Sequence, residues 1–147
     1  METLLDQFIY LARKELGVSE KNNPDRILHY NDFTNLRARN VHTPWCSSFL
    51  NFIVSSAGCI STRSAAAKSW LTWGEEIEEP IRGCIAVLKR TEDPRFGHTG
   101  LFNFQNGNLI NILGGDQDES VCYANFSASK LISYRVPLGF KPNLSLN

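Results

Sequence analysis

Two stretches in the first half of the chain carry apolar residues every three or four positions, the spacing of one buried face of an α-helix. The first covers residues 3–16 and precedes Gly17, a residue type that commonly ends helices. The second covers residues 46–57. Their apolar positions are Leu4, Leu5, Phe8, Leu11, Ala12 and Leu16 in the first stretch and Phe49, Leu50, Ile53, Val54 and Ala57 in the second. Both stretches are predicted to be helices that cover a core.

Capping residues indicate two more helices. Asn23 can cap a helix that begins at Pro24, because proline lacks the N–H group that a first helical turn leaves unpaired. The serine or threonine at 61–62 can cap another helix, which ends before Gly74. The charged segment 75–80 is expected to be a solvated connection.

The apolar pattern changes after Gly83 to short, nearly continuous runs of the kind that form buried strands. Asn106-Gly107 stands between two such runs and is the strongest short signal for a hairpin. Gly114-Gly115 is predicted to end the second strand of that hairpin. The predicted strands cover 84–88, 98–104, 109–113, 120–123 and 131–136.

The helices come first in the chain and the strands follow, which predicts an α+β fold with N-terminal helices packed on a central antiparallel β-sheet. The 147 residues suit a single domain, 1–147, with a helical part over about 1–74 and a sheet part over about 83–137. A chain of this length buries roughly two-thirds of its unfolded surface, so it needs no metal or cross-link to fold.

Composition narrows the function. The 15 basic and 15 acidic residues cancel, so nothing in the net charge favours a nucleic-acid partner. No apolar run approaches the ~20 residues of a membrane-spanning helix, and the N-terminal segment resembles no secretory signal. We expect a monomer without membrane insertion, made in the cytoplasm and, if its substrate lies outside, delivered by a non-Sec route.

The four cysteines are widely spaced and form no C-x-x-C pair, which argues against a structural zinc site and a thioredoxin-like redox motif. Cys59, Cys84 and Cys122 have apolar neighbours and are expected to be small buried hydrophobic residues. A disulfide among them stays open if the protein is exported.

Cys46 differs, because it follows the turn Thr43-Pro44-Trp45 and opens the apolar helix. Unpaired N–H groups and the positive end of the helix dipole meet at that position and favour a thiolate. With a histidine partner, such a position can lower a cysteine pKa from ~8.5 to about 3.5–7.5. Cys46 is therefore a candidate nucleophile.

A cysteine nucleophile needs a base, and the base needs a third group that orients it. His98 is favoured as the base, since it opens a predicted strand between two nearby glycines; His29 lies in a helix and His42 in a loop. Asp116 lies just past the next strand, where it can return to the level of His98. Gln117 is a possible substitute, and a plain turn role for Gly-Gly-Asp is equally open.

This order of cysteine, histidine and acid resembles that of papain-like cysteine hydrolases. The segments TPWCSSFLNFIVSSAG, SAAAKSWLTWG, GCIAVLKR, FGHTGLF, LGGDQ and KLISYRVP resemble successive motifs of the NlpC-type cell-wall peptidases and related CHAP amidases, in particular their compact bacterial and phage branch. The family often has an acidic residue where Cys84 stands and Asn where Asp116 stands.

The resemblance implies a papain-like (NlpC/CHAP) fold and hydrolysis of a peptidoglycan amide bond, in the stem peptide, its cross-link or the sugar–peptide junction. It implies Cys46 as nucleophile, His98 as general base and then acid, and Asp116 as the residue that orients His98. No cofactor or metal is expected. Trp45, Gln117 and Trp73 are the predicted substrate-binding residues, with core packing as the alternative for Trp73.

Two other functions stay open at this point. The first is a wall-binding module that keeps the cleft without catalysis, and the second is a metal site built from Cys46, His98 and Asp116. As a hydrolase without a signal peptide, the chain would be a phage lysin or an injected antibacterial effector. An effector would also need an immunity protein that inhibits it in its producer.

Overall fold

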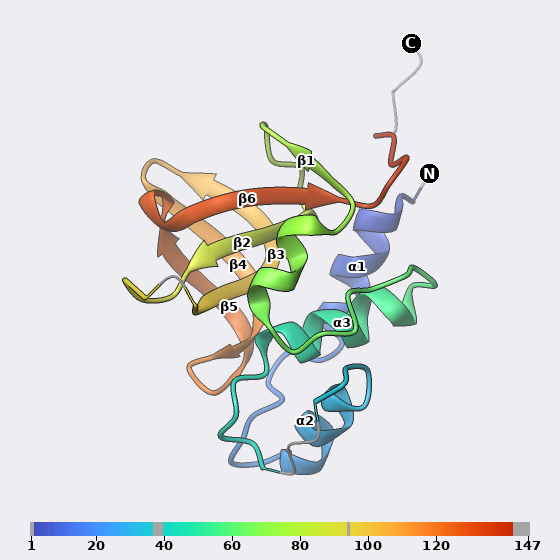
Figure 1. Cartoon of the computed structure of the whole chain (residues 1–147), viewed down its shortest axis with the longest axis vertical. Helices are drawn as coiled ribbons and strands as arrows, with labels where there is room; N and C mark the ends of the chain where they lie inside the picture. The colour runs from blue at the N-terminus through green and yellow to red at the C-terminus, as the bar shows by residue number, and fades with distance from the viewer. Residues whose placement is uncertain (1, 37–39, 94, 143–147) are drawn as a thin grey trace.

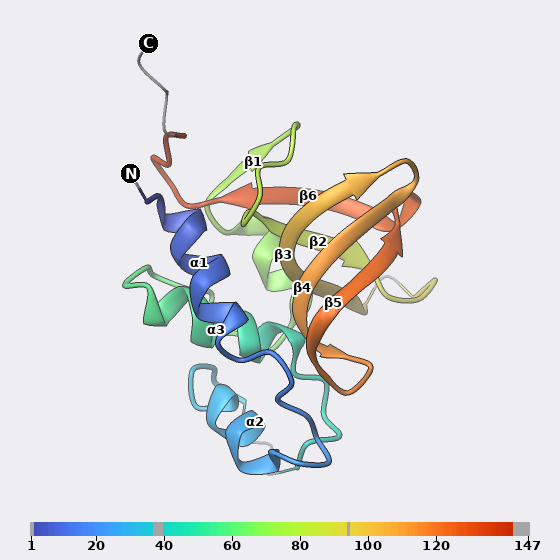
Figure 2. The same cartoon turned by 180° about the vertical axis from the view of Figure 1, so that it is seen from behind.

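Helices from the first part of the chain pack against an open, antiparallel, six-stranded sheet in the computed structural model, which describes residues 2–36, 40–93 and 95–142 (Figures 1 and 2). The order of strands across the sheet is β1-β6-β2-β3-β4-β5. This arrangement confirms the predicted α+β class with N-terminal helices on an antiparallel sheet. Among the described residues, no helix is long and apolar enough to cross a bilayer.

The described residues form three α-helices, α1 (Leu4–Arg13), α2 (Pro24–Asn31) and α3 (Cys46–Ser56). A reciprocal capping box between Thr3 and Asp6 starts α1, and Pro24 is the first residue of α2, as predicted. Helix α1 ends before Leu16, because the chain there turns to the sheet and the Gly17 N–H donates to the carbonyl of Val121 at 3.0 Å.

The helix predicted after residues 61–62 is a short 3-10 helix, η1 (Ala67–Thr72), preceded by irregular chain. The side chain of Asn51 explains the late start. Its Oδ1 accepts from the Arg63 N–H at 2.6 Å and its Nδ2 donates to the Ser64 carbonyl at 3.0 Å, which holds this segment against α3 instead of in a helix.

The strands are β1 (Glu75–Ile77), β2 (Ile85–Lys89), β3 (Gly97–Asn106), β4 (Leu109–Gln117), β5 (Ser120–Ser127) and β6 (Leu131–Val136), with a 3-10 turn η2 (Ala128–Lys130) before β6. The hairpin at Gly107 is confirmed, with the glycine at φ 60°. The prediction of a solvated connection at 75–80 is wrong in part, since β1 pairs with β6 at the sheet edge.

Strand β4 continues past Gly114-Gly115, where the sequence predicted its end, and a β-bulge makes this possible. Gly114 pairs with Cys122 and Gln117 pairs with Ser120, so β4 carries one extra residue between these pairs. Gly115 also lets β4 approach α3, because a Cβ there would lie 2.7 Å from the Phe49 Cβ. The bulge thus lies beside the start of α3.

Helix α3 is the central helix of the layer. It packs on β3 and β4, and both α1 and α2 pack on it, with α2 far from the β1–β6 edge in both views (Figures 1 and 2). Its apolar residues Phe49, Leu50, Ile53 and Val54 are fully buried, as the periodicity predicted. Burial of each such side chain contributes about 1.5–3 kcal/mol, so the core holds the first turn of α3 against the sheet.

Candidate active site

Cys46 is the first residue of α3 and is 3% exposed. The adjoining core residues Trp45 and Phe49 are completely buried, so the helix start has little freedom to move. The backbone N–H of Thr99, the residue after His98, lies close enough to the thiol to lower its pKa. The fold therefore brings the start of α3 to the start of β3, with Cys46 near Thr99, the residue that follows His98.

Burial reverses the expected acidity of this thiol. The pKa of Cys46 is raised to about 11; loss of solvation is the largest cause and the charge of Asp116 also raises it, whereas Thr99 and Arg90 lower it. The expectation of a lowered pKa is therefore wrong for the resting protein, in which Cys46 is a thiol. The helix start favours the anion, but desolvation outweighs it.

His98 is the second residue of β3 and is 5% exposed. Its ring stacks on Phe126, with 5.0 Å between the ring centroids. Its Nε2 lies 2.9 Å from the Oε1 of Gln117. Burial lowers the pKa of His98 below its usual 6.5, so the imidazole is neutral at pH 7.

The surroundings of Gln117 determine which nitrogen of His98 carries the proton. The Gln117 Nε2 donates to the carbonyls of Ile112 at 3.1 Å and Cys122 at 2.7 Å, so its Oε1 must face His98 as an acceptor. The His98 Nε2 is then the protonated nitrogen. The Nδ1 is left with its lone pair free, as a general base requires.

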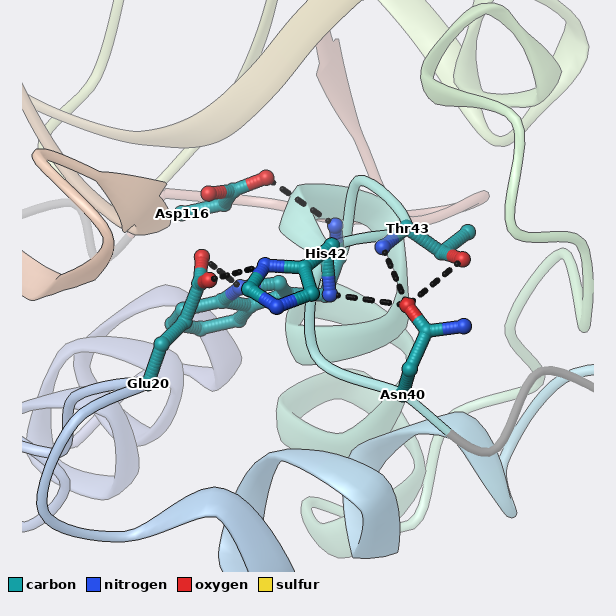
Figure 3. A network of polar contacts seen from close by, with 6 residues as sticks. Glu20, Asn40, His42, Thr43 and Asp116 are labelled. Atoms are coloured by element: carbon teal, nitrogen blue, oxygen red, sulfur yellow. Dashed lines mark hydrogen bonds and ion pairs between the residues drawn. The ribbon is translucent and has the colours of Figure 1, made fainter.

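Asp116 has a different contact from the one predicted for it. Its Oδ2 accepts from the backbone N–H of Trp45 at 3.2 Å, which satisfies a donor at the beginning of α3 (Figure 3). Its backbone lies in the left-handed region at φ 54°, which aspartate tolerates better than most residues. Burial and the charge of Glu20 raise the pKa of Asp116 above 3.8, with the Trp45 N–H opposing them.

The bulge in β4 explains why Gln117 faces His98. Continuing the regular pairing of Leu101 with Leu113 by three residues would put Asp116 opposite His98. The extra residue in the bulge moves every later side chain by one position, and one position in a strand changes the face of the sheet. Gln117 consequently points toward His98, and Asp116 points toward Trp45.

Trp45 is held on two sides and lines no surface groove. Its indole Nε1 donates to the Oε2 of Glu20 at 3.1 Å, and the other oxygen of Glu20 lies 3.6 Å from the Nδ1 of His42 (Figure 3). The Oδ1 of Asn40 accepts from the N–H groups of His42 and Thr43. This network anchors the loop before Cys46, and the complete burial of Trp45 does not fit a substrate-contacting role.

A pocket of about 270 Å³ opens beside His98. Charged and polar side chains line much of it, among them Arg90, Asp116, Gln117 and Asp118. Cys46 is not among its lining residues. Trp73 lines a separate apolar pocket with Ile60 and Leu138, and its indole donates to the Ile60 carbonyl. Of the three predicted substrate-binding residues, only Gln117 therefore lies at the pocket of His98.

Comparisons with protein-family models, with curated protein sequences and with solved structures found no match to this chain. The resemblance to the NlpC-type and CHAP hydrolases therefore depends on the sequence motifs, and the fold agrees with it at the level of the α+β class.

Metal binding finds no support in the described parts of the chain, where no three His, Cys, Asp or Glu side chains converge as metal ligands. Cys46, His98 and Asp116 therefore do not form the metal site considered from the sequence. The carboxylate of Asp116 accepts from the Trp45 N–H instead. All four cysteines are free thiols; Cys84 is buried, and Cys59 and Cys122 are partly exposed.

Two residues of the site were not recognised in the sequence. Glu20 holds Trp45 from 25 positions away, and Arg90 follows β2 at the pocket. Neither belongs to a local motif, because their contacts arise only when distant segments meet. His29 lies on α2 and does not line the pocket of His98; its Nδ1 lies 3.5 Å from the Oδ2 of Asp32, the residue after the helix.

Proposed function

We propose that this protein is a papain-like cysteine hydrolase that cleaves an amide bond of peptidoglycan. The observation that carries the proposal is the hydrogen bond between His98 and Gln117, in which the fixed amide of Gln117 leaves the His98 Nδ1 as a free base. A buried, oriented, neutral histidine near a cysteine at a helix start is the arrangement that nucleophilic amide hydrolysis requires.

The reaction would begin with transfer of the Cys46 thiol proton to the His98 Nδ1 as the sulfur attacks the amide carbon. The backbone N–H of Cys46 belongs to the first helical turn and has no partner within α3, so it can donate to the oxyanion. The imidazolium then protonates the leaving amine. Water attacks the thioester, His98 takes its proton, and the carboxylate product leaves with the thiol restored.

The resting state would be a neutral pair. A thiol with a pKa of about 11 and an imidazole with a pKa below 6.5 do not exchange a proton before substrate binds. Proton transfer would therefore accompany attack, with His98 as a general base, and no thiolate–imidazolium pair would exist beforehand. Gln117 would act as the positioning residue for His98, and Asp116 would position the chain that leads into Cys46.

The choice of peptidoglycan comes from the motifs, and their positions in the fold support it. TPWC ends at the start of α3, FGHTGLF opens β3, and LGGDQ forms the bulge. These three segments are distant in the sequence and meet around His98. The papain-like topology and the cell-wall substrate belong to the same proposal, as does delivery by a non-Sec route as a lysin or effector.

One observation favours the non-catalytic alternative. Cys46 is 3% exposed and does not line the pocket, so a wall-binding module could use the pocket without the thiol. Hydrolysis requires that the scissile carbonyl reach the sulfur beside His98. The two functions differ in whether new chain ends appear when the protein meets its substrate.

Digestion of purified peptidoglycan by wild type, Cys46→Ala and the control Cys59→Ala tests the proposal. We expect wild type and Cys59→Ala to release new amino groups and Cys46→Ala to release none. Mass spectrometry of the released muropeptides would identify the bond. Binding without release by all three proteins would establish the wall-binding alternative instead.

Delivery has its own test. We expect the protein to be harmless when produced in the bacterial cytoplasm and lytic when a signal directs it to the periplasm, with Cys46→Ala harmless in both. An immunity protein, if the protein is an effector, would protect the periplasm and bind wild type directly. Equal toxicity in both compartments would contradict a cell-wall target.

A further inference from the structure

Arg90 lies where β2 ends and β3 begins. The last pairs between these strands join Leu88 to His98 and Lys89 to Gly97, so Arg90 immediately follows the part of β2 that runs beside His98. Arg90, His98 and Asp116 line the same pocket of about 270 Å³. An arginine is therefore placed at the mouth of the candidate active site by strand pairing.

The charge of Arg90 reaches the central groups of the site. It lowers the pKa of Cys46, His98 and Asp116 alike, which requires that the guanidinium lie within electrostatic range of all three. Asp116 directs its Oδ2 to Trp45. The pocket thus contains a cation close to the reacting groups, and its nearest catalytic neighbours do not neutralise it by direct contact.

Several other arginines of the protein have partners. Arg26 donates to Glu15 at 2.7 Å, Arg95 donates to Asp93 at 2.6 Å, and Arg135 donates to the Trp73 carbonyl at 2.8 Å. Within the described residues, the side chain of Arg90 makes no hydrogen bond or ion pair. Its five N–H donors are available to a ligand in the pocket.

We propose that Arg90 binds a free carboxylate of the substrate, next to the amide bond that is cleaved. This inference rests on the proposed function, since it names a chemical feature of the substrate of the same site. A planar guanidinium matches a carboxylate with two parallel N–H···O bonds, which no lysine can form. Arg90 would then be a specificity-determining residue that selects peptides with an acidic group beside the scissile amide.

Binding to the inactive variant Cys46→Ala provides the test without any need for catalysis. The probes are muropeptides from purified peptidoglycan and the same muropeptides with their carboxyl groups converted to amides. Titration calorimetry compares Cys46→Ala alone with Cys46→Ala carrying Arg90→Gln, Arg90→Lys or the control Arg13→Gln. Arg13 is an exposed arginine on α1 that lines a different pocket.

We expect Arg90→Gln to weaken binding of the native muropeptides about 10- to 100-fold, as loss of a charged hydrogen-bonded pair predicts. Amidation should weaken binding to the parent protein as much, and Arg90→Gln should then add nothing. Arg90→Lys should recover part of the loss, and Arg13→Gln should have no effect. In the active enzyme, Arg90→Lys should raise KM more than it changes kcat.

The inference is overturned if native muropeptides do not bind the parent protein, if Arg90→Gln binds them normally, or if it loses equal affinity for the amidated ones. The last result would indicate a general effect of charge or folding. Hydrolysis that depends on Cys46 but not on Arg90 would leave the proposed function standing alone. Carboxylate binding that depends on Arg90, in a protein that hydrolyses nothing, would leave only the binding site.

Discussion

The Nε2 of His98 lies 2.9 Å from the Oε1 of Gln117, and the amide nitrogen of Gln117 is held by two backbone carbonyls. The orientation of the imidazole thus depends on an amide side chain that cannot rotate without breaking two hydrogen bonds. Asp116, one residue earlier, does not contact His98 in this way; its carboxylate accepts from the N–H of Trp45. The two neighbours have separable roles, which leads to the first two predictions.

Replacement of Gln117 by Leu should lower kcat by about a hundredfold, within the contribution of a positioned general base. Leucine fills a similar volume but offers no acceptor to the His98 Nε2. Asp116→Asn is the matched variant and should change kcat by no more than a few fold. Steady-state kinetics on peptidoglycan fragments, with circular dichroism as a check of folding, measures both. The reverse ranking would identify Asp116 as the group that orients His98.

Asp116→Ala should reduce the free energy of unfolding by about 1–2 kcal/mol, because it removes the acceptor of the Trp45 N–H. Alanine is also strained at the φ of 54° found there, so Asp116→Gly separates loss of the acceptor from backbone strain. Asp116→Asn keeps an acceptor oxygen and loses the charge that Glu20 repels. Urea unfolding at pH 7 should rank Asn at or above wild type and Ala lowest.

The stability difference between Asp116→Asn and wild type should depend on pH. Folding raises the pKa of Asp116, so the carboxyl favours the folded state below pH 3.8 and loses that contribution as pH rises through its folded pKa. The advantage of Asp116→Asn over wild type should therefore be present at pH 7 and absent below pH 3.8. An advantage that is constant across this range would mean that the charge plays no part.

Alkylation of Cys46 by iodoacetamide should accelerate about tenfold for each pH unit between pH 6 and pH 9. The reason is that only the thiolate reacts and the pKa of Cys46 is raised to about 11 by burial. Peptide mass spectrometry must follow Cys46 individually, because Cys59 and Cys122 are partly exposed. Asp116→Asn removes a charge that raises this pKa and should react faster at each pH. A rate that is constant above pH 7 would instead reveal a preformed thiolate.

The pH dependence of the proposed hydrolase activity should be set by the ionisation of His98 on its acidic side. Burial lowers the pKa of His98 below 6.5, so kcat/KM should exceed half its maximum at pH 6.5 and decline as the pH falls through the lowered value. A half-maximum above pH 6.5 would contradict a lowered pKa for His98.

Two adjacent serines of α3 offer a test of the scaffold behind the site. The Ser47 Oγ accepts from the buried indole N–H of Trp70 at 2.9 Å, whereas the Ser48 Oγ is buried without a hydrogen-bond partner among the described residues. Ser47→Ala should cost about 1–3 kcal/mol, because the indole N–H is left unpaired. Ser48→Ala should cost nothing or stabilise the fold. Equal losses in urea unfolding would refute the assignment of these contacts.

Elements that are set by residues adjacent in the sequence have the positions that the sequence predicted. The bounds of β6 match the predicted 131–136, Pro24 begins α2, and the hairpin turns at Gly107. Strand β1 was missed, because its pattern is charged and only pairing with β6 makes it a strand. The 3-10 helix η1 starts late because the side chain of Asn51 holds the chain before it.

Local patterns predicted the apolar face of α3, the position of Cys46 at the start of this helix and the position of His98 near the start of a strand, since periodicity and turn residues act locally. The contact between Gln117 and His98 and the protonated state of Cys46 depend instead on segments that are distant in the sequence. One extra residue in the bulge of β4 exchanges the directions of Asp116 and Gln117, and no local pattern marks that change. The pKa of Cys46 depends on how completely the assembled core excludes water, which is a property of the whole fold.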